Sequence, residues 1–251
     1  MNKGQARKKS TRKNTWYGKA ILLFVVLVAA FAVKGYVYPQ NPPEVKEQKQ
    51  QQAEKVLTVE ERAQRIVQRM TPEQKIGQMV MIGINGTAID KETQKILNDY
   101  QLGNIIFFDR NMETMEQVTQ LNRGLKKVIT TQTGIEPFIA IDQEGGNVAR
   151  MRNALTVMPS AAKLGQRDSD ETRNCAIETA RELKKIGFNV NFAPVADLDL
   201  SYSRSYGSTP ETVIKYAGAA CEGYKAEGMF CSLKHFPGIG GTTLDSHMDR
   251  P

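Results

Sequence analysis

The sequence predicts an α/β fold of parallel strands and helices, and three observations support that class. Five short runs of apolar residues recur from residue 57 onward, and they are apolar almost throughout rather than at alternate positions. Such runs are typical of parallel strands that are covered on both faces. Helical patterns separate the runs, and Gly187 and Gly228 each end a helical pattern just before a strand. Together these features predict repeated βα units.

The first elements of this domain are expected to be two short helices. Thr58 and Glu61 have the spacing of a capping box before an amphipathic helix. Thr71-Pro72 starts a second helix, with Gln74 three residues after the cap. We expect the five strands that follow at residues 78–84, 104–108, 138–142, 190–195 and 229–234.

Two later helices are each expected to have an apolar face. In the first, over residues 171–186, the inward side chains are those of Ala176, Ile177, Ala180 and Leu183. The second begins at Thr209-Pro210-Glu211, and its inward side chains are those of Val213, Ala217, Ala220, Cys221 and Tyr224. Both faces are expected to cover the sheet.

Basic residues are concentrated at the start of the chain. Of the 34 Lys and Arg residues, eight lie within the first 34 positions, which hold no acidic residue, so 26 basic residues remain beside 27 acidic ones. A domain so close to neutral charge is a poor ligand for nucleic acid, because counterion release requires clustered Lys and Arg on the folded surface. We therefore expect no nucleic-acid partner. The composition, 40% hydrophobic and 24% charged, also excludes collagen-like, wholly disordered and disulfide-scaffold classes.

The residues before the domain are predicted to be a targeting region and a linker. Residues 1–19 form a basic cytoplasmic head, and residues 20–38 form a transmembrane anchor or a signal peptide. Residues 39–56 are rich in Pro, Gln, Glu and Lys and are expected to be a disordered linker. The α/β domain then occupies residues 57–251.

The apolar segment allows two interpretations. Its uncharged part, residues 20–33, is about 21 Å long as a helix, shorter than the ~30 Å hydrocarbon core of a bilayer. In one interpretation, the Ala-Phe-Ala sequence at 30–32 is the cleavage site of a removed signal peptide. In the other, which the long basic head and the linker favour, Lys34 snorkels and the stretch continues to Tyr38 as an uncleaved anchor. Either way we expect the domain to lie outside the cytoplasm.

The three cysteines are expected to be buried free thiols. Cys175, Cys221 and Cys231 lie among apolar or small residues, and no metal-ligand spacing connects them. An odd number of cysteines outside the cytoplasm permits one disulfide at most. We expect neither a metal nor another cofactor.

Polar side chains follow the predicted strands at the point where each strand ends. Asp142, Asp197 and the pair Lys234-His235 all lie at or just beyond the carboxyl end of a strand. Loops and helix N-termini converge at this end of α/β folds, so it is where their chemistry usually lies. These positions are therefore candidate functional residues.

The segment from Lys234 to His247 is the most informative part of the chain, and it contains both histidines. Asp245 and His247 are separated by one residue, so both side chains point the same way if the loop is extended. A carboxylate beside an imidazole fixes its tautomer and raises its pKa, which gives a proton-transfer group near neutral pH. From these residues alone, a solvent-exposed surface pair is an equally good interpretation.

The chain resembles the β-N-acetylglucosaminidases of glycoside hydrolase family 3 in five blocks that occur in the family's order. These are FFDRN at 107–111, IDQEGGNVARM at 141–151, NVNFAPVADLD at 189–199, RSYG at 204–207, and KHFPG with DSH between 234 and 247. The resemblance covers about residues 57–251. It implies a (β/α)8 TIM-barrel type of fold, of which about five βα units are present. It also implies hydrolysis of terminal non-reducing β-linked N-acetylglucosamine from cell-wall-type glycans, with retention and without a cofactor.

The resemblance also implies roles for individual residues. Asp142, Arg150 and Arg204 correspond to residues that bind sugar hydroxyls, and Lys234 and His235 to those that hold the sugar in the −1 subsite. For the first three, a structural ion-pair network over the barrel mouth is the alternative interpretation.

Catalysis is assigned by the resemblance to the second pair in the same loop. His247 corresponds to the residue that transfers the proton, and Asp245 to the residue that orients it.

The chain also departs from the family pattern. Ile239 stands where the family usually has a second histidine, Gly241 replaces an acidic residue, and Asn147 replaces a common arginine. The family's nucleophilic aspartate lies on a later strand, which we do not find before Pro251, and a retaining glycosidase requires that carboxylate. We therefore expect little or no turnover from this chain and an open, apolar edge on its five-strand sheet. A catalytically inactive, membrane-tethered sugar-binding or scaffold protein is the alternative function.

Overall fold

The computed structural model describes residues 57–199 and 203–240. The chain divides into two compact units, residues 1–62 and 63–251. In the described part of the first unit, the helix α2 (Val59–Arg69) begins at the predicted capping box. Glu61 N donates to Thr58 Oγ1 at 3.1 Å, and Thr58 N donates to Glu61 Oε2 at 2.9 Å.

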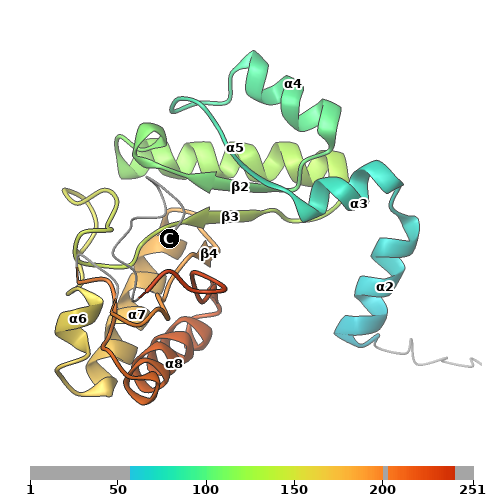
Figure 1. The fold of residues 1–251 in the computed structure, drawn as a ribbon. Coiled ribbons are helices and arrows are strands. Elements are labelled where there is room, and N and C mark those ends of the chain that lie inside the picture. Colours follow the sequence, from blue (N-terminus) through green and yellow to red (C-terminus); the bar gives the residue numbers. More distant parts are fainter. Residues whose placement is uncertain (1–56, 200–202, 241–251) are drawn as a thin grey trace, which may run out of the picture. The chain divides into compact units, whose positions relative to one another are not determined.

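The second unit is built on a parallel sheet in which the strands lie in sequence order (Figure 1). The strands are β1 (Met81–Gly83), β2 (Asn104–Phe107), β3 (Phe138–Ile141), β4 (Val190–Asn191) and β5 (Phe230–Cys231). Every neighbouring pair is parallel, and each strand lies within a predicted strand segment. The predicted α/β class and the parallel sheet are therefore confirmed.

Helices connect the strands, as Figure 1 shows. The structure has α3 (Pro72–Met79), α4 (Lys91–Tyr100), the 3-10 helix η1 (Asp109–Asn111), α5 (Met115–Thr133), α6 (Ala161–Leu164), α7 (Ser169–Lys185) and α8 (Pro210–Ala226). The predicted starts of α3 and α8 are confirmed, since Thr71 and Thr209 cap them with their side chains. The helices α7 and α8 also bury most of the side chains that were expected to face inward.

The main hydrophobic core lies between one face of the sheet and the helices α5, α7 and α8. Phe107 of β2 and Phe188, just before β4, are both fully buried and meet edge to face, with ring centroids 5.3 Å apart. Leu125 of α5 and Leu183 of α7 pack into the same cluster. A smaller cluster around Tyr206 and Tyr216 joins α6, α7 and α8. The positions of the strands, and hence of the residues at their carboxyl ends, are fixed by this packing.

Three predicted strand limits were wrong by more than one residue. Gln78 lies in α3, because the helix that Thr71 caps continues to Met79 before the chain extends. The strand β4 ends at Asn191 rather than at Val195. Its pairing with the neighbouring strands is interrupted because Pro194 has no N–H group to donate. Pairing between the same two segments resumes only at an isolated bridge between Val195 and Lys234, so β5 is also shorter than predicted.

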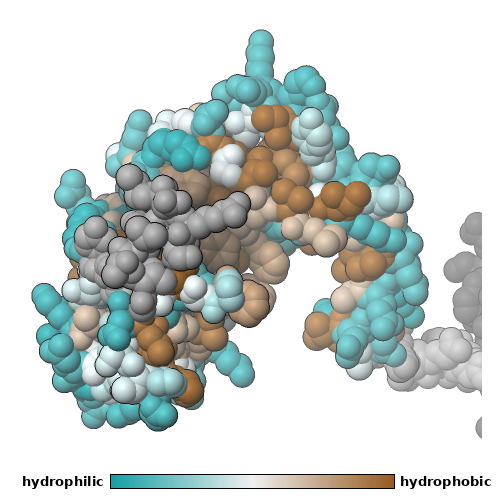
Figure 2. Space-filling view, in the orientation of Figure 1, coloured by the Kyte–Doolittle hydropathy of each residue, from teal (hydrophilic) through white to brown (hydrophobic). Residues whose placement is uncertain are grey.

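Apolar side chains are exposed on and just after the last strand of the described sheet. Phe230 of β5 is 59% exposed and meets Phe138 of β3 edge to face, while Leu233 is 57% exposed. Figure 2 also shows apolar residues on the surface around α3, where Ile76 and Met79 are exposed.

The predicted basic head, apolar segment and linker at residues 1–56 lie outside the described residues. Within residues 57–199 and 203–240, we find no helix with the length and apolar character needed to cross a bilayer. The three cysteines are free, as predicted, but they are half-buried rather than buried.

Candidate active site

The structure brings four of the predicted sugar-binding residues together at the carboxyl end of the sheet. Asp142 follows the last residue of β3 directly. Lys234 and His235 follow β5, and Arg204 lies on the loop between β4 and α8. Residues up to 92 positions apart in the sequence therefore meet at one end of the strands.

An ion-pair network connects these side chains. Lys234 Nζ lies 2.7 Å from Asp142 Oδ1 and 2.6 Å from Glu144 Oε1. Arg204 forms a two-pronged pair with the same glutamate, with Nε donating to Oε2 at 2.9 Å and Nη2 to Oε1 at 2.8 Å. Glu144 thus links the two cations, and its side chain is only 7% exposed. For Asp142 and Arg204, an ion-pair network was the predicted alternative to sugar binding, and the structure contains such a network.

Glu144 is held in its charged form by this network. Burial alone would raise the pKa of the carboxyl group, but Arg204 and Lys234 outweigh that effect and bring the pKa below its ordinary value. In return, the hydrogen bonds to Glu144 raise the pKa of the Arg204 guanidinium against the opposing effect of burial. The two groups therefore stay ionised together.

His235 extends the network to a second buried carboxylate. Its Nδ1 lies 2.6 Å from Asp197 Oδ2, and its Nε2 lies 3.2 Å from Arg204 Nη2. Because a guanidinium can only donate, Nε2 must be the acceptor and carries no proton, so Nδ1 carries the proton and donates it to Asp197. His235 is thus a neutral Nδ1–H imidazole in this arrangement.

Asp197 holds both His235 and the loop that follows it through hydrogen bonds. Besides the imidazole, it accepts hydrogen bonds from the backbone N–H of His235 at 3.1 Å and of Ile239 at 2.8 Å. Burial opposes ionisation, but the bonds from His235 and Ile239 prevail and lower the pKa of Asp197. The side chain is 1% exposed, so it acts on the site through His235 and the following loop.

A tight turn places Glu144 over the strand ends. Gly145 and Gly146 have φ angles of +92° and +56°, which side-chain-bearing residues rarely adopt. A Cβ at Gly145 would lie 2.6 Å from Pro159 O, and one at Gly146 would lie 2.6 Å from Ser160 Cβ. The two glycines of the IDQEGG block are therefore needed for this turn.

Arg150 does not join the ion-pair network. Its Nη1 lies 2.6 Å from Asp109 Oδ2, beyond the end of β2, and its backbone N–H donates to Gln143 Oε1 at 2.7 Å. Its Nε is buried and has no hydrogen-bond partner among the residues the structure describes. Arg150 is thus held near the strand ends with one donor unused.

The predicted catalytic pair, Asp245 and His247, lies outside the described residues. Within the described ranges, no group of three or more His, Cys, Asp or Glu side chains could hold a metal ion. Asp197 was predicted as a strand-end residue without a specific role, and Glu144 was not predicted as a site residue. The available signal for Glu144 was its position two residues after Asp142, immediately before the glycine turn.

The buried carboxylates predict a specific acid dependence of stability. Their pKa values are lowered on folding, so their contribution is fully present above the unfolded values and is lost as the pH falls through the folded ones. We expect the free energy of unfolding to fall as the pH drops below about 4.5, the ordinary value for glutamate. Urea denaturation across this range measures it. If Glu144→Gln loses stability with acid as steeply as the wild type, the contribution assigned to Glu144 is wrong.

A parallel α/β sheet with a charged site at its carboxyl ends is the arrangement in which α/β domains, both barrels and open sheets, carry their functional loops. The particular family follows from comparison with known proteins. Residues 71–251 match the glycosyl hydrolase family 3 N-terminal domain, and the chain belongs to that family.

Relatives of known name agree with this assignment. A β-hexosaminidase of Thioalkalivibrio sulfidiphilus is 34% identical over 184 residues, which cover 68% of this chain and 52% of that protein. The structure of a family 3 β-N-acetylglucosaminidase from Paenibacillus sp. str. FPU-7 matches with a TM-score of 0.68 and 36% identity, over 71% of this chain and 35% of that one. The structure of NagZ from Neisseria gonorrhoeae in complex with N-trifluoroacetyl-D-glucosamine matches with a TM-score of 0.62 and 34% identity. The match covers 67% of this chain and 52% of that one. The chain spans about half the length of the curated relatives it matches.

Proposed function

We propose that this chain binds a terminal, non-reducing, β-linked N-acetylglucosamine unit and takes part in its hydrolytic release from cell-wall-type glycans. The observation that supports this most directly is the network of Asp142, Glu144, Lys234, Arg204 and His235 at the carboxyl ends of the strands. The names of the family 3 relatives, β-hexosaminidase and β-N-acetylglucosaminidase, support the sugar and the reaction.

The chemistry of the network suits neighbouring sugar hydroxyls. A hydroxyl both donates and accepts, so a carboxylate beside an ammonium or guanidinium group offers it both kinds of partner. Lys234 Nζ donates a hydrogen bond to Asp142 Oδ1. Within the described residues, Asp142 Oδ2 accepts no hydrogen bond, so it is an acceptor for a sugar hydroxyl. The side chain of Arg150, which is paired with Asp109 and 22% exposed, adds a further donor group at the same end of the sheet. In this proposal Asp142, Arg150, Arg204, Lys234 and His235 bind the substrate.

The bond-breaking step is assigned to other residues. In the proposed mechanism, His247 gives a proton to the departing glycosidic oxygen and Asp245 holds its imidazole in the required tautomer. Retention of configuration requires a carboxylate nucleophile on the opposite side of the sugar from the proton donor. The five described strands would then be part of a (β/α)8 barrel whose other units complete the site. The basic head and the apolar segment support a location outside the cytoplasm, with the N-terminal segment as a membrane anchor.

A second function is sugar binding without catalysis, and the charges of the network favour it. Glu144, Lys234 and Arg204 neutralise one another in largely buried ion pairs that keep each group ionised, which suits groups that bind hydroxyls rather than groups that transfer protons.

Calorimetric titration of the chain with N-acetylglucosamine tests the proposal, with glucose as the control that lacks the acetamido group. We expect saturable binding of N-acetylglucosamine that exceeds the binding of glucose. The absence of saturable binding by a folded chain would overturn the proposal. A chromogenic β-N-acetylglucosaminide, with its α-anomer as the control, then separates the two functions, because only the enzyme releases the chromophore.

A further inference from the structure

The register of the sheet places Cys231 on the helix-covered face. Cys231 of β5 pairs with Asn191 of β4, so the two side chains point to the same side of the sheet. Asn191 Nδ2 lies 3.1 Å from the hydroxyl of Tyr224, a buried residue of α8. Cys231 accordingly packs against the main hydrophobic cluster, of which Tyr224 is a member.

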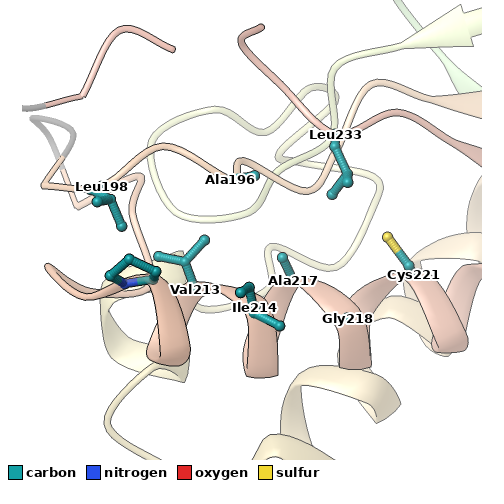
Figure 3. Close-up of a pocket in the computed structure, with 9 residues that line it drawn as sticks. Ala196, Leu198, Val213, Ile214, Ala217, Gly218, Cys221 and Leu233 are labelled. Carbon is teal, nitrogen blue, oxygen red and sulfur yellow. The ribbon is translucent and has the colours of Figure 1, made fainter. Parts of the chain in front are cut away.

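Cys221 lies on α8, which packs against β5. It lies three residues before Tyr224, on the same face of the helix. It also lines an apolar cavity of about 540 Å³ together with Leu233, which follows β5. Figure 3 shows the sulfur of Cys221 projecting from α8 on the side of Ala217, toward the segment that carries Leu233.

The two cysteines lie on facing segments, and the third cysteine is not part of the pair. Leu233, two residues after Cys231 on the same segment, lines the cavity that Cys221 also lines. Burial and the nearby Cys231 thiol raise the pKa of Cys221 to about 12. Cys175 lies on α7 and packs against the smaller cluster, and the raised pKa of its thiol comes from burial and from Glu171. Of the three pairings that the sequence allows, the fold therefore favours only one.

We propose that Cys221 and Cys231 are a disulfide-forming pair that ties α8 to β5 when the chain meets a low-molecular-weight disulfide. The thiolate of one cysteine attacks a sulfur of oxidised glutathione and releases one glutathione thiolate, which leaves a mixed disulfide on the protein. The thiolate of the other cysteine attacks the protein sulfur of this mixed disulfide and releases the second glutathione. The two protein thiols lose their protons and two electrons, and the oxidised glutathione is reduced to two thiols.

The cavity beside Cys221 provides access for the reagent, and the position of the pair gives the cross-link a structural effect. Cys231 lies three residues before Lys234, so the bond would fix the strand that carries Lys234 and His235 to α8. Closing this short loop covalently restricts the unfolded chain, from which we expect a rise in Tm of about 5 °C.

Peptide mapping tests the pairing. The chain is incubated with oxidised glutathione at mildly alkaline pH, blocked with iodoacetamide and digested with trypsin without reduction. Cleavage after Lys215, Lys225 and Lys234 separates the two cysteines, so we expect peptides 216–225 and 226–234 to be joined and to separate on reduction. Cys175 should be found in peptide 174–181, outside any protein disulfide.

A matched set of variants tests the effect on stability. Oxidation should raise the Tm of the wild type and of Cys175→Ala, but not of Cys221→Ser or Cys231→Ser. The proposal is overturned if Cys221 and Cys231 are alkylated or glutathionylated separately, or if either joins Cys175. The mapping uses the wild-type chain, so it decides the question even if a serine variant does not fold.

Discussion

Glu144→Gln is expected to lower the free energy of unfolding by about 3 kcal/mol, because it leaves two partly buried cations without their shared anion. Lys234 and Arg204 have side chains that are only 14% and 18% exposed, and Glu144 lies between them. The amide preserves the shape of the side chain but not its charge, so the loss measures electrostatics rather than packing. Urea denaturation followed by circular dichroism gives the value.

The matched control is Glu171→Gln, which removes the glutamate of an exposed ion pair. Glu171 lies 3.0 Å from Arg167 on the surface of α7, and both side chains are about half exposed. Solvent screens such a pair, so we expect a change of about 0.5 kcal/mol or less. Equal losses in the two variants would show that the buried network does not stabilise the fold.

Asp197→Asn is expected to disturb the site in a way that NMR can detect. The carboxylate accepts three hydrogen bonds, from His235 Nδ1 and from the N–H groups of His235 and Ile239. An amide presents its NH2 group to at least one of these donors, which leaves a buried donor unsatisfied at a cost of about 2 kcal/mol. It also removes the charge that favours the Nδ1–H form of His235.

Long-range ¹H–¹⁵N spectra of the imidazoles report the tautomer directly. The chain has two histidines, and a His247→Gln variant assigns the remaining signal to His235. We expect a protonated Nδ1 and an unprotonated Nε2 in the wild type, and a shift toward the Nε2–H form in Asp197→Asn. Asp99→Asn, in an exposed pair with Lys95 on α4, is the control and should leave the signal unchanged. An Nε2–H form in the wild type would contradict the assigned direction of the bond to Arg204.

Local patterns in the sequence were sufficient to predict the class of fold. The capping boxes at Thr58 and Thr71 involve residues three positions apart, so the sequence shows both partners at once. The strands were predicted because each is a continuous apolar run bounded by turn residues. Their limits could not be predicted, because the end of β4 depends on how Pro194 meets the neighbouring strand, which is a tertiary property.

The site could be predicted only in part for the same physical reason. Asp142 and Lys234 each follow an apolar run, which marks both as strand-end residues. The pairing of Glu144 with Arg204, 60 residues later, depends on the glycine turn and on the loop after β4. No periodicity predicts such a contact. Arg150, which the resemblance also assigns to sugar binding, pairs its charge with Asp109 rather than with Glu144.

Titration of Lys234→Met with N-acetylglucosamine tests most directly whether this network binds the sugar. Loss of a charge-assisted hydrogen bond should weaken binding by about 10- to 100-fold relative to the wild type. Lys234→Arg, which keeps the charge, should retain more of the affinity, and Lys225→Met, at an exposed position of α8, should bind as the wild type does. Circular dichroism establishes that each variant is folded. If folded Lys234→Met binds N-acetylglucosamine with the wild-type affinity, the network at the carboxyl ends of β3 and β5 is not the sugar site.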